Sequence, residues 1–171
     1  TEKIVSIFEA HTNIIRRGKE ARPVEYGHKL WLNEVEGGLV SHYRILDGNP
    51  SDEKQWKPSL KAHLKTFQHP PIQASADRGL SSDPNETLAH DLGVRYVVIP
   101  KRGYRSKARL KHEHKAWFVK GRHWQAGVEG RISVLKRAHG LGRCLNHGET
   151  GFQGWVGWGV IAGNLAVLGR T

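Results

Sequence analysis

Two acidic residues, Asp77 and Glu129, stand out because of what surrounds them in the sequence. Asp77 directly follows a short apolar stretch that is typical of a strand, and ligand sites of open α/β sheets form at the carboxyl ends of strands. Glu129 is the only acid between Glu113 and Glu149, inside the most basic part of the chain. Each is a candidate metal ligand. The alternatives are a turn or capping role for Asp77 and a surface ion pair for Glu129.

Positive charge is concentrated in one part of the chain. The formal net charge is +11, and residues 101–143, the basic segment, contain thirteen Lys and Arg against two acids. The rest of the sequence carries fourteen residues of each sign, so the whole excess lies in this segment. Such a concentration favours binding to a polyanion, above all nucleic acid. A solvated surface that only aids solubility is the alternative.

His112, Glu113 and His114, with Cys144 and His147, are the residues that could suggest a zinc site. Their spacing fits no closed zinc module, and histidines two positions apart on a helix point to different faces. We therefore expect DNA contact or solvent exposure for the paired histidines.

The tryptophans divide into two groups. Trp117 and Trp124 lie in the basic segment, where an aromatic ring can stack on bases, with packing as the alternative. Trp155 and Trp158 lie in the most apolar stretch, so we expect both to pack in the core.

Length and composition bound the class of protein. The 171 residues are enough for one domain with a sizeable core, and 37% of them are hydrophobic. No apolar run approaches the ~18 residues of a membrane span, and no signal peptide is visible. The single cysteine fits a reducing cytoplasm. The chain begins at Thr1 and contains no methionine, from which we expect a fragment of a longer protein.

The order of elements along the chain is typical of an α/β fold with a mixed sheet. Gly37 and Gly38 predict a hairpin turn between two strands. Ser51 is expected to cap the first helix. We predict strands at 27–36, 39–46, 72–76 and 94–99, and helices at 51–68, 83–91, within 101–143 and at 152–168. The last helix is expected to pack on the sheet.

Six short segments, in this order and spacing, resemble motifs of one enzyme family, the DDE transposases of bacterial insertion sequences. Residues 129–136 pair a glutamate with a lysine, as in the family's carboxy-terminal signature, and residues 76–79 resemble its second-acid motif, Asp-x-Gly after a strand. The other similar segments are 6–12, 26–29 (Tyr-Gly-x-Lys), 46–52 (Gly-Asn-Pro-x-Asp) and 157–165. The resemblance covers nearly the whole chain and implies an RNase H-like catalytic fold.

The resemblance also implies metal-assisted phosphoryl transfer on DNA, with Mg²⁺ (or Mn²⁺) held by carboxylates. Asp77 takes the place of the second acid and Glu129 that of the third, so both are expected to be catalytic and to bind metal. Lys136 is expected on the same helix face as Glu129, in contact with a DNA phosphate. Further DNA contacts are expected from Lys101, Arg102, Arg122, Arg131 and Arg137.

The first acid of the family pattern is missing. It lies on a strand before the Tyr-Gly-x-Lys hairpin, and no such motif precedes Tyr26. Glu9 is a poor substitute, and Asp47 and Asp52 follow the hairpin, where the order is wrong. Because the missing strand is the central one of the sheet, we expect an incomplete fold that is inactive alone.

A second departure lies upstream of Glu129. Where the family often has a Tyr and an Arg, this chain has Arg122 and Gln125. A guanidinium that can hold a phosphate with two hydrogen bonds is thus replaced by a neutral amide. We expect weaker engagement of DNA at this point.

These observations predict one partial catalytic domain. It would consist of a lead-in (1–27), a sheet with helices (28–100), the basic segment with the third acid (101–143) and a carboxy-terminal helix (151–171). The expected partner is double-stranded DNA, at transposon ends and target, and homo-oligomer formation is left open. The alternatives are a nucleic-acid-binding module without chemistry and a highly charged RNA-binding protein. Only the catalytic function requires Asp77 and Glu129 to converge on shared metals.

Overall fold

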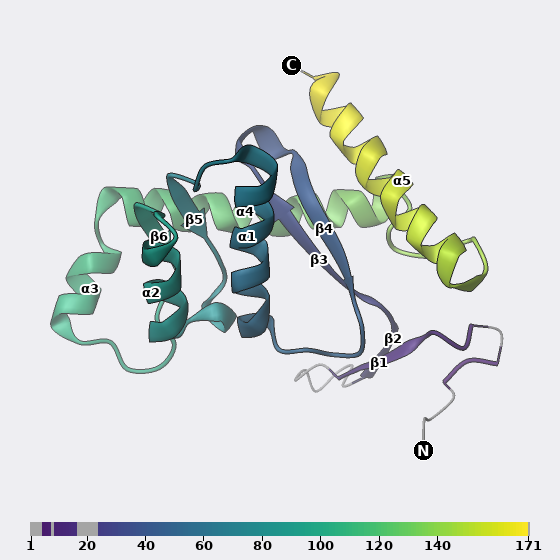
Figure 1. The fold of residues 1–171 in the computed structure, drawn as a ribbon, viewed down its shortest axis with the longest axis horizontal. Coiled ribbons are helices and arrows are strands. Elements are labelled where there is room, and N and C mark those ends of the chain that lie inside the picture. The colour runs from purple at the N-terminus through teal and green to yellow at the C-terminus, as the bar shows by residue number, and fades with distance from the viewer. Residues whose placement is uncertain (1–4, 8, 17–23, 171) are drawn as a thin grey trace. The chain divides into compact units, whose positions relative to one another are not determined.

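The computed structural model describes residues 5–7, 9–16 and 24–170. They form two compact units, which we call unit 1 (residues 1–50 and 131–171) and unit 2 (residues 51–130). Both contain strands and helices, so the predicted α/β class is confirmed (Figure 1). The long helix α4 (Ala116–Ala138) contributes residues to both units.

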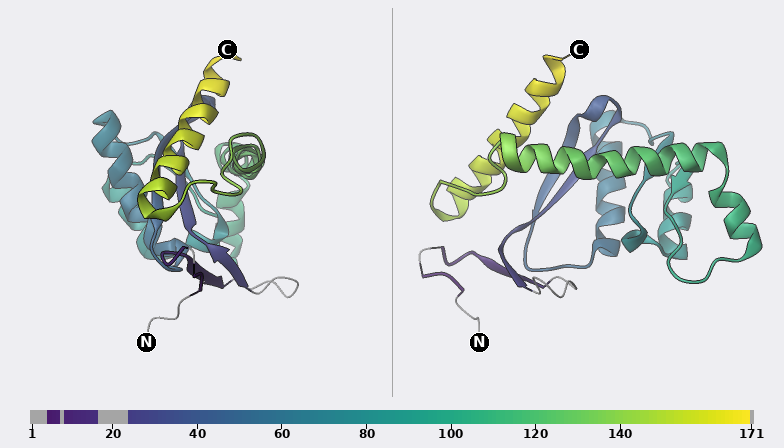
Figure 2. Two further views of the ribbon diagram at one scale, coloured as in Figure 1. Left: turned by 90° about the vertical axis from the view of Figure 1, so that its right-hand side faces the viewer. Right: turned by 180° about the vertical axis from the view of Figure 1, so that it is seen from behind.

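Unit 2 has helices on both faces of a pair of parallel strands. Its elements before α4 are η2 (Asp52–Gln55), α1 (Trp56–Phe67), β5 (Gln73–Ser75), η3 (Arg78–Leu80), α2 (Asp83–Asp91), β6 (Tyr96–Val98) and α3 (Lys107–Glu113). The strands β5 and β6 are parallel. Helices α1 and α2 lie in front of them in Figure 1, and the view from behind in Figure 2 shows α4 across their other face.

Local sequence explains where the helices of unit 2 begin. The Ser82 hydroxyl caps α2 by accepting a hydrogen bond from the Asn85 amide. Ser51 lies at the N-cap position, as expected, but its side chain makes no capping hydrogen bond, and the helix begins as the 3-10 helix η2, which leads into α1. Pro58 has no N–H to donate, and it is accommodated in the first turn of α1, where that donor has no helical partner.

One edge of strand β5 has no neighbouring strand. The Tyr96 amide donates to the Ile72 carbonyl and the Ala76 amide to the Val98 carbonyl, so these residues of the β5 segment face β6. Backbone groups alternate along a strand, so those of Gln73 and Ser75 point to the opposite edge. Within the described part of the chain, no strand pairs with that edge.

Unit 1 contains two antiparallel strand pairs and a long helix. Its elements are β1 (Asn13–Arg16), β2 (Val24–Gly27), β3 (Lys29–Glu34), η1 (Glu36–Gly38), β4 (Val40–Leu46), the end of α4, and α5 (Gly148–Leu168). The predicted hairpin β3–β4 is confirmed, with Gly37 and Gly38 both at positive φ in its turn. The expected lead-in instead contains the pair β1–β2, and residues 17–23 lie outside the described residues.

The strands do not form the single mixed sheet that the sequence predicted. In the residues with assigned structure there are three two-stranded sheets, β1–β2, β3–β4 and β5–β6. The sheet of unit 2 ends at the open edge of β5, because a sheet continues only where backbone donors and acceptors meet a further strand. The RNase H-like arrangement therefore stays a proposal.

Helix α5 packs closely on its own unit through glycines. A Cβ at Gly159 or Gly163 would come within 2.5 Å of a leucine side-chain carbon, of Leu141 or Leu135 respectively. The Asn164 amide side chain accepts from the Val40 N–H and donates to the Val40 carbonyl, which fixes α5 beside β4. The expected packing of this helix on strands is confirmed.

The two tryptophans of α5 have different environments. The Trp155 indole donates to the Gly140 carbonyl at 2.8 Å and is half-buried, as expected for a packing residue. The expectation for Trp158 is wrong, because its side chain is exposed, on the face of α5 away from the buried Val156 and Val160. In the described helices, none is long and apolar enough to cross a membrane.

Candidate metal and nucleic-acid site

Asp77 lies at the carboxyl end of β5, where the sequence placed it. Its side chain is exposed, and one carboxylate oxygen accepts a hydrogen bond from the Arg78 amide at 2.7 Å, which begins η3. The capping role considered as the alternative is therefore present. The other oxygen, Oδ2, remains at the surface of unit 2 and can take part in a ligand site.

A second acid, Asp52, approaches the same place. A Cβ on Gly79 would lie 3.9 Å from Asp52 Oδ2 and 4.0 Å from Asp77 Oδ2, so both carboxylates border the space above this glycine. Asp52 is not among the site residues predicted from the sequence, because it follows the hairpin. The signal that could have included it is its place as the last residue of the Gly-Asn-Pro-x-Asp segment, where η2 begins.

The Glu129 side chain is exposed on α4 and makes no hydrogen bond or ion pair with the part of the chain that the structure describes. Helix α4 crosses the strands at Gly121, where a Cβ would meet Val98 and Ser75 side-chain atoms at 2.7 and 3.1 Å. Glu129 follows two turns later, about 12 Å along the helix axis. No hydrogen bond or ion pair joins the Glu129 side chain to Asp77 among the described residues.

These acids match a divalent metal in chemical type but not in number. Carboxylate oxygens are the protein ligands that Mg²⁺ and Mn²⁺ prefer. Yet no group of three or more His, Cys, Asp or Glu in the described chain could hold a metal ion. Asp77 and Glu129 would need a further ligand to hold a metal ion.

The residues of unit 2 that are predicted to contact DNA differ in whether they already form an ion pair. Arg102 and Arg122 have exposed side chains. Lys101 is half-buried, with its Nζ 3.9 Å from a carboxylate oxygen of Asp83. Arg102 and Arg122 can therefore reach a phosphate without giving up an ion pair, whereas Lys101 would exchange one.

The predicted contacts in unit 1 lie near the end of α4. Lys136 and Arg137 are exposed in its last turn. Arg131 instead forms an ion pair with Glu34, whose side chain is only 5% exposed. A buried carboxylate that lost this partner would be left with an uncompensated charge, so Arg131 is tied to β3. Its DNA contact stays a prediction.

Glu113 is the centre of a buried ionic network rather than a metal ligand. It accepts hydrogen bonds from the Lys101 amide, from Arg105 and from the Arg109 Nε. Arg109 also binds Glu86 through both terminal nitrogens. Burial alone would raise the pKa of Glu113, but these hydrogen bonds outweigh it and the pKa is lowered. The network fixes α3 against α2 and leaves its lysines outside.

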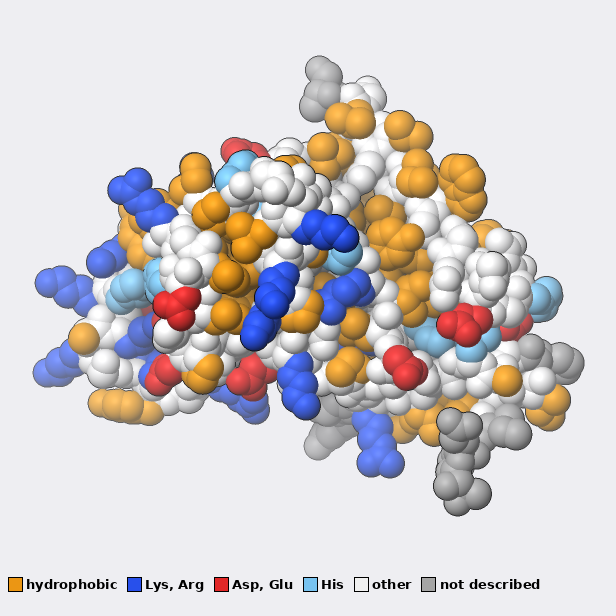
Figure 3. Space-filling view, in the orientation of Figure 1, with side chains coloured by type: hydrophobic (Ala, Val, Ile, Leu, Met, Phe, Trp, Pro, Cys, Tyr) orange, Lys and Arg blue, Asp and Glu red, His pale blue; other side chains and the backbone are white. Residues whose placement is uncertain are grey.

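Exposed lysines lie along α3, in the link after it and in the first turns of α4, and the first three of them are four residues apart. They are Lys107, Lys111 and Lys115, followed by Lys120. Figure 3 shows Lys and Arg side chains gathered where α3 lies. These lysines are not among the predicted DNA contacts, although the spacing of the first three is visible in the sequence. Like charges four residues apart disfavour an isolated helix, and phosphate contacts would relieve that repulsion.

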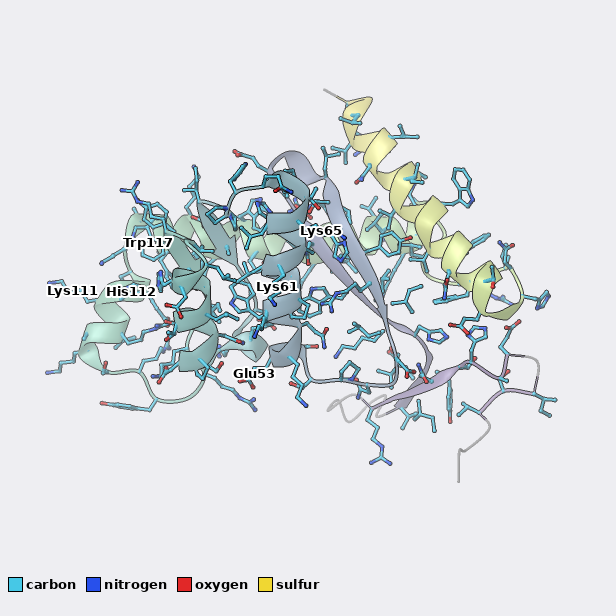
Figure 4. The ribbon with its side chains drawn as sticks, viewed as in Figure 1. Glu53, Lys61, Lys65, Lys111, His112 and Trp117 are labelled. Carbon is cyan, nitrogen blue, oxygen red and sulfur yellow. The ribbon has the colours of Figure 1, made fainter. Side chains whose placement is uncertain are left out.

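Trp117 is engaged in packing between aromatic rings. Its ring lies 5.0 Å from that of Tyr96 and 5.2 Å from that of His112, and Figure 4 shows His112 of α3 near Trp117 of α4. Burial lowers the pKa of His112, with the charges of Arg109 and Lys115 adding to the effect. A neutral His112 adds no charge to this surface at pH 7.

A chain of hydrogen bonds in unit 1 was not foreseen. The Asn13 amide nitrogen lies 3.3 Å from His28 Nδ1, His28 Nε2 lies 2.7 Å from His11 Nδ1, and His11 Nε2 lies 2.9 Å from Glu9. Because an amide nitrogen can only donate, Nδ1 of His28 is the acceptor and its proton lies on Nε2, which donates to His11 Nδ1. The proton of His11 then lies on its own Nε2, which donates to Glu9. Glu9 also accepts from His147 and from the Gly148 amide. No local pattern indicates contacts between such distant residues.

Comparison with known proteins adds no assignment to this geometry. No protein-family model, no curated protein and no solved structure matches the chain.

Proposed function

We propose that this chain is the carboxy-terminal part of the catalytic domain of a bacterial insertion-sequence DDE transposase. It would bind double-stranded DNA through the basic segment and supply Asp77 and Glu129 as two of three catalytic acids. The observation that supports this most is the exposed Asp77 at the carboxyl end of a parallel strand, in the same unit as exposed rows of cations. The proposal includes an RNase H-like fold and a cytoplasmic location.

The open edge of β5 supports a fold that is completed by another strand. Gln73 and Ser75 direct unpaired backbone groups to that edge, and two-stranded parallel sheets are rarely stable by themselves. A strand paired there would run beside the segment that leads to Asp77. In this proposal that strand lies outside the described residues and brings the first acid.

The chemistry follows from the residue types. When bound, Mg²⁺ would activate a water or a 3′-hydroxyl and stabilise the leaving oxygen of a phosphodiester. Asp77 and Glu129 present carboxylate oxygens at the surface of unit 2. Arg122 and Lys136, exposed on α4, would hold phosphates of the DNA in position.

The salt dependence of DNA binding tests the proposal. We expect the chain to bind a mixed-sequence duplex with an affinity that falls steeply with salt, since each phosphate contact adds about 0.9 to the slope of log K against log salt. Arg122→Glu should lower the affinity several-fold and reduce that slope by about one. Fluorescence anisotropy of a labelled duplex at several salt concentrations measures both.

Arg170→Glu is the matched control, because it changes the net charge equally at an exposed residue outside the basic segment. It should leave the slope nearly unchanged. If both variants reduce the slope alike, binding depends only on net charge and the proposed interface is wrong. Failure of the unmodified chain to bind DNA at low salt would overturn the proposed function.

The second candidate is a nucleic-acid-binding module without chemistry. The observation in its favour is that the described acids, His and Cys form no group of three that could hold a metal. Such a module would need the exposed cations of α3 and α4 but neither Asp77 nor Glu129. The two candidates therefore differ in whether metal ions bind at both acids.

A further inference from the structure

Helix α5 has no charged side chain from residue 150 to residue 168. Its inner face is buried in unit 1, with Val156, Gly159, Val160 and Gly163 at the contact. A helix that is apolar on all sides is normally covered on all sides. The outer face of α5 is not covered by the residues that the structure describes.

The outer face carries four large hydrophobic side chains. Their exposed fractions are 71% for Trp158, 47% for Ile161, 62% for Leu165 and 55% for Leu168. Figure 3 shows the hydrophobic side chains gathered along this helix. Four such residues in one row form a contiguous patch, and patches of this kind mark interaction sites.

The spacing of the four residues indicates the partner. Steps of three, four and three residues are those of the a and d positions of helices that pair with other helices. This order of steps is the same in both chain directions. Two antiparallel copies of α5 would therefore place Trp158 opposite Leu168 and Ile161 opposite Leu165, so that each large side chain meets another. That is the self-complementarity of a two-fold interface.

We propose that the outer face of α5 binds the same face of a second copy of this chain, in an antiparallel pair about a two-fold axis. The absence of charge along the face removes like-charge repulsion from the contact itself, although the chain as a whole is strongly basic. The inference rests on α5 alone and does not depend on the proposed transposase function.

The surface area that the two helices can bury limits the affinity of this dimer. The four side chains would bury roughly 400 Å² per copy, since a buried aromatic side chain covers about 150–250 Å² and aliphatic ones less. A standard interface buries about 800 Å² per partner. Because the helix is already held in place by its inner face, little ordering is required on binding. The dimer should therefore be weak and dependent on concentration.

Sedimentation velocity of the whole chain over roughly 1 to 300 μM tests the dimer. The unmodified chain should shift from monomer to dimer over this range. Leu165→Lys and Trp158→Lys should shift the midpoint to at least ten-fold higher concentration. Gln153→Lys, on the same helix but outside the row, is the matched control and should leave the midpoint unchanged. Circular dichroism checks that each variant keeps its helix content.

Disulfide trapping tests the direction of the pair. In a Cys144→Ser background, a mixture of Ile161→Cys and Leu165→Cys chains should cross-link on mild oxidation with copper phenanthroline. Cross-linking of Ile161→Cys chains with one another alone would indicate a parallel pair and overturn the proposed geometry. The proposed dimer would be overturned if the unmodified chain stays monomeric at the highest concentration. It would also be overturned if Gln153→Lys weakens association as much as Leu165→Lys and Trp158→Lys do.

Discussion

The carboxylate of Glu9 accepts hydrogen bonds from His147, His11 and the Gly148 amide, and thereby connects the segment before β1 with the start of α5. These bonds, from His147 first, lower the pKa of Glu9. Burial, followed by the charge of His11, lowers the pKa of His28. His11 and His28 share one proton at a nitrogen–nitrogen distance of 2.7 Å, so charging both rings would break the chain of hydrogen bonds.

We therefore predict that unit 1 loses stability in acid in two steps. The pKa of His28 in the folded chain is below its ordinary value of 6.5, so its contribution is complete above pH 6.5 and lost as the pH falls through the folded pKa. The contribution of Glu9 is complete above 4.5 and lost as the pH falls through its lowered pKa. Urea midpoints measured from pH 8 to about pH 4, before acid unfolding becomes general, would show the first step.

His28→Gln should flatten the dependence of stability on pH just below 6.5. His123→Gln is the control, because His123 is exposed on α4, and it should keep the full dependence. Equal pH profiles for the unmodified chain and His28→Gln would contradict the assigned role of His28.

At the scale of elements, the approach of α4 to the strands depends on one glycine. A Cβ at Gly121 would lie 2.7 Å from a methyl carbon of Val98, which is almost fully buried, and within 3.1 Å of polar atoms of Gln73 and Ser75. Because the valine cannot move away, any side chain at this position must displace the helix. This contact determines where the helix that bears Arg122 and Glu129 crosses unit 2.

Gly121→Ala should therefore destabilise the chain. Overpacking a core costs about 1–3 kcal/mol, and the better helix propensity of alanine offsets at most about 1 kcal/mol of this. Gly130→Ala on the same helix meets no atom within 4 Å, so it should stabilise by up to about 1 kcal/mol. Chemical denaturation of both variants gives the comparison. A stabilising Gly121→Ala would show that α4 does not pack this closely on the strands.

At the scale of the whole molecule, a strong positive charge is combined with an incomplete set of metal ligands among the described residues. Its net charge of +11 lies in the basic segment, and part of that charge is neutralised by Glu86, Glu113 and Glu34. Two acids, Asp77 and Glu129, lie in segments that resemble the acidic motifs of the family. A whole enzyme of the proposed class needs a third, and the open edge of β5 is where a strand could bring it.

We predict that the isolated chain does not nick supercoiled DNA in Mg²⁺ or Mn²⁺, because two carboxylates hold the metals too weakly. Nicking that depends on Mg²⁺ and disappears in Asp77→Asn would contradict this prediction. Mn²⁺ alone, in NMR titrations, should still broaden amide signals near both Asp77 and Glu129, and less so in Asp77→Asn. Broadening at neither acid would favour the binding module without chemistry.

The sequence by itself determined the local structure of this protein. The Gly37–Gly38 turn, the helix that begins near Asp83 and the position of Asp77 after a strand follow from backbone preferences and from contacts within a few residues. Charge is also a property of composition, so the basic segment could be found without a structure. The family resemblance stays a prediction, because short motifs in order do not fix how they meet in space.

Tertiary structure alone decided the partners of these residues. Arg131 binds Glu34, which is 97 positions away, and Trp158 faces outward from a helix whose composition suggested burial on every side. Glu9 meets His147 across 138 positions. The physical reason is the same in each case: local sequence sets which element a residue belongs to, but its partner depends on how distant elements pack, and packing follows from the combined shape and burial of many side chains.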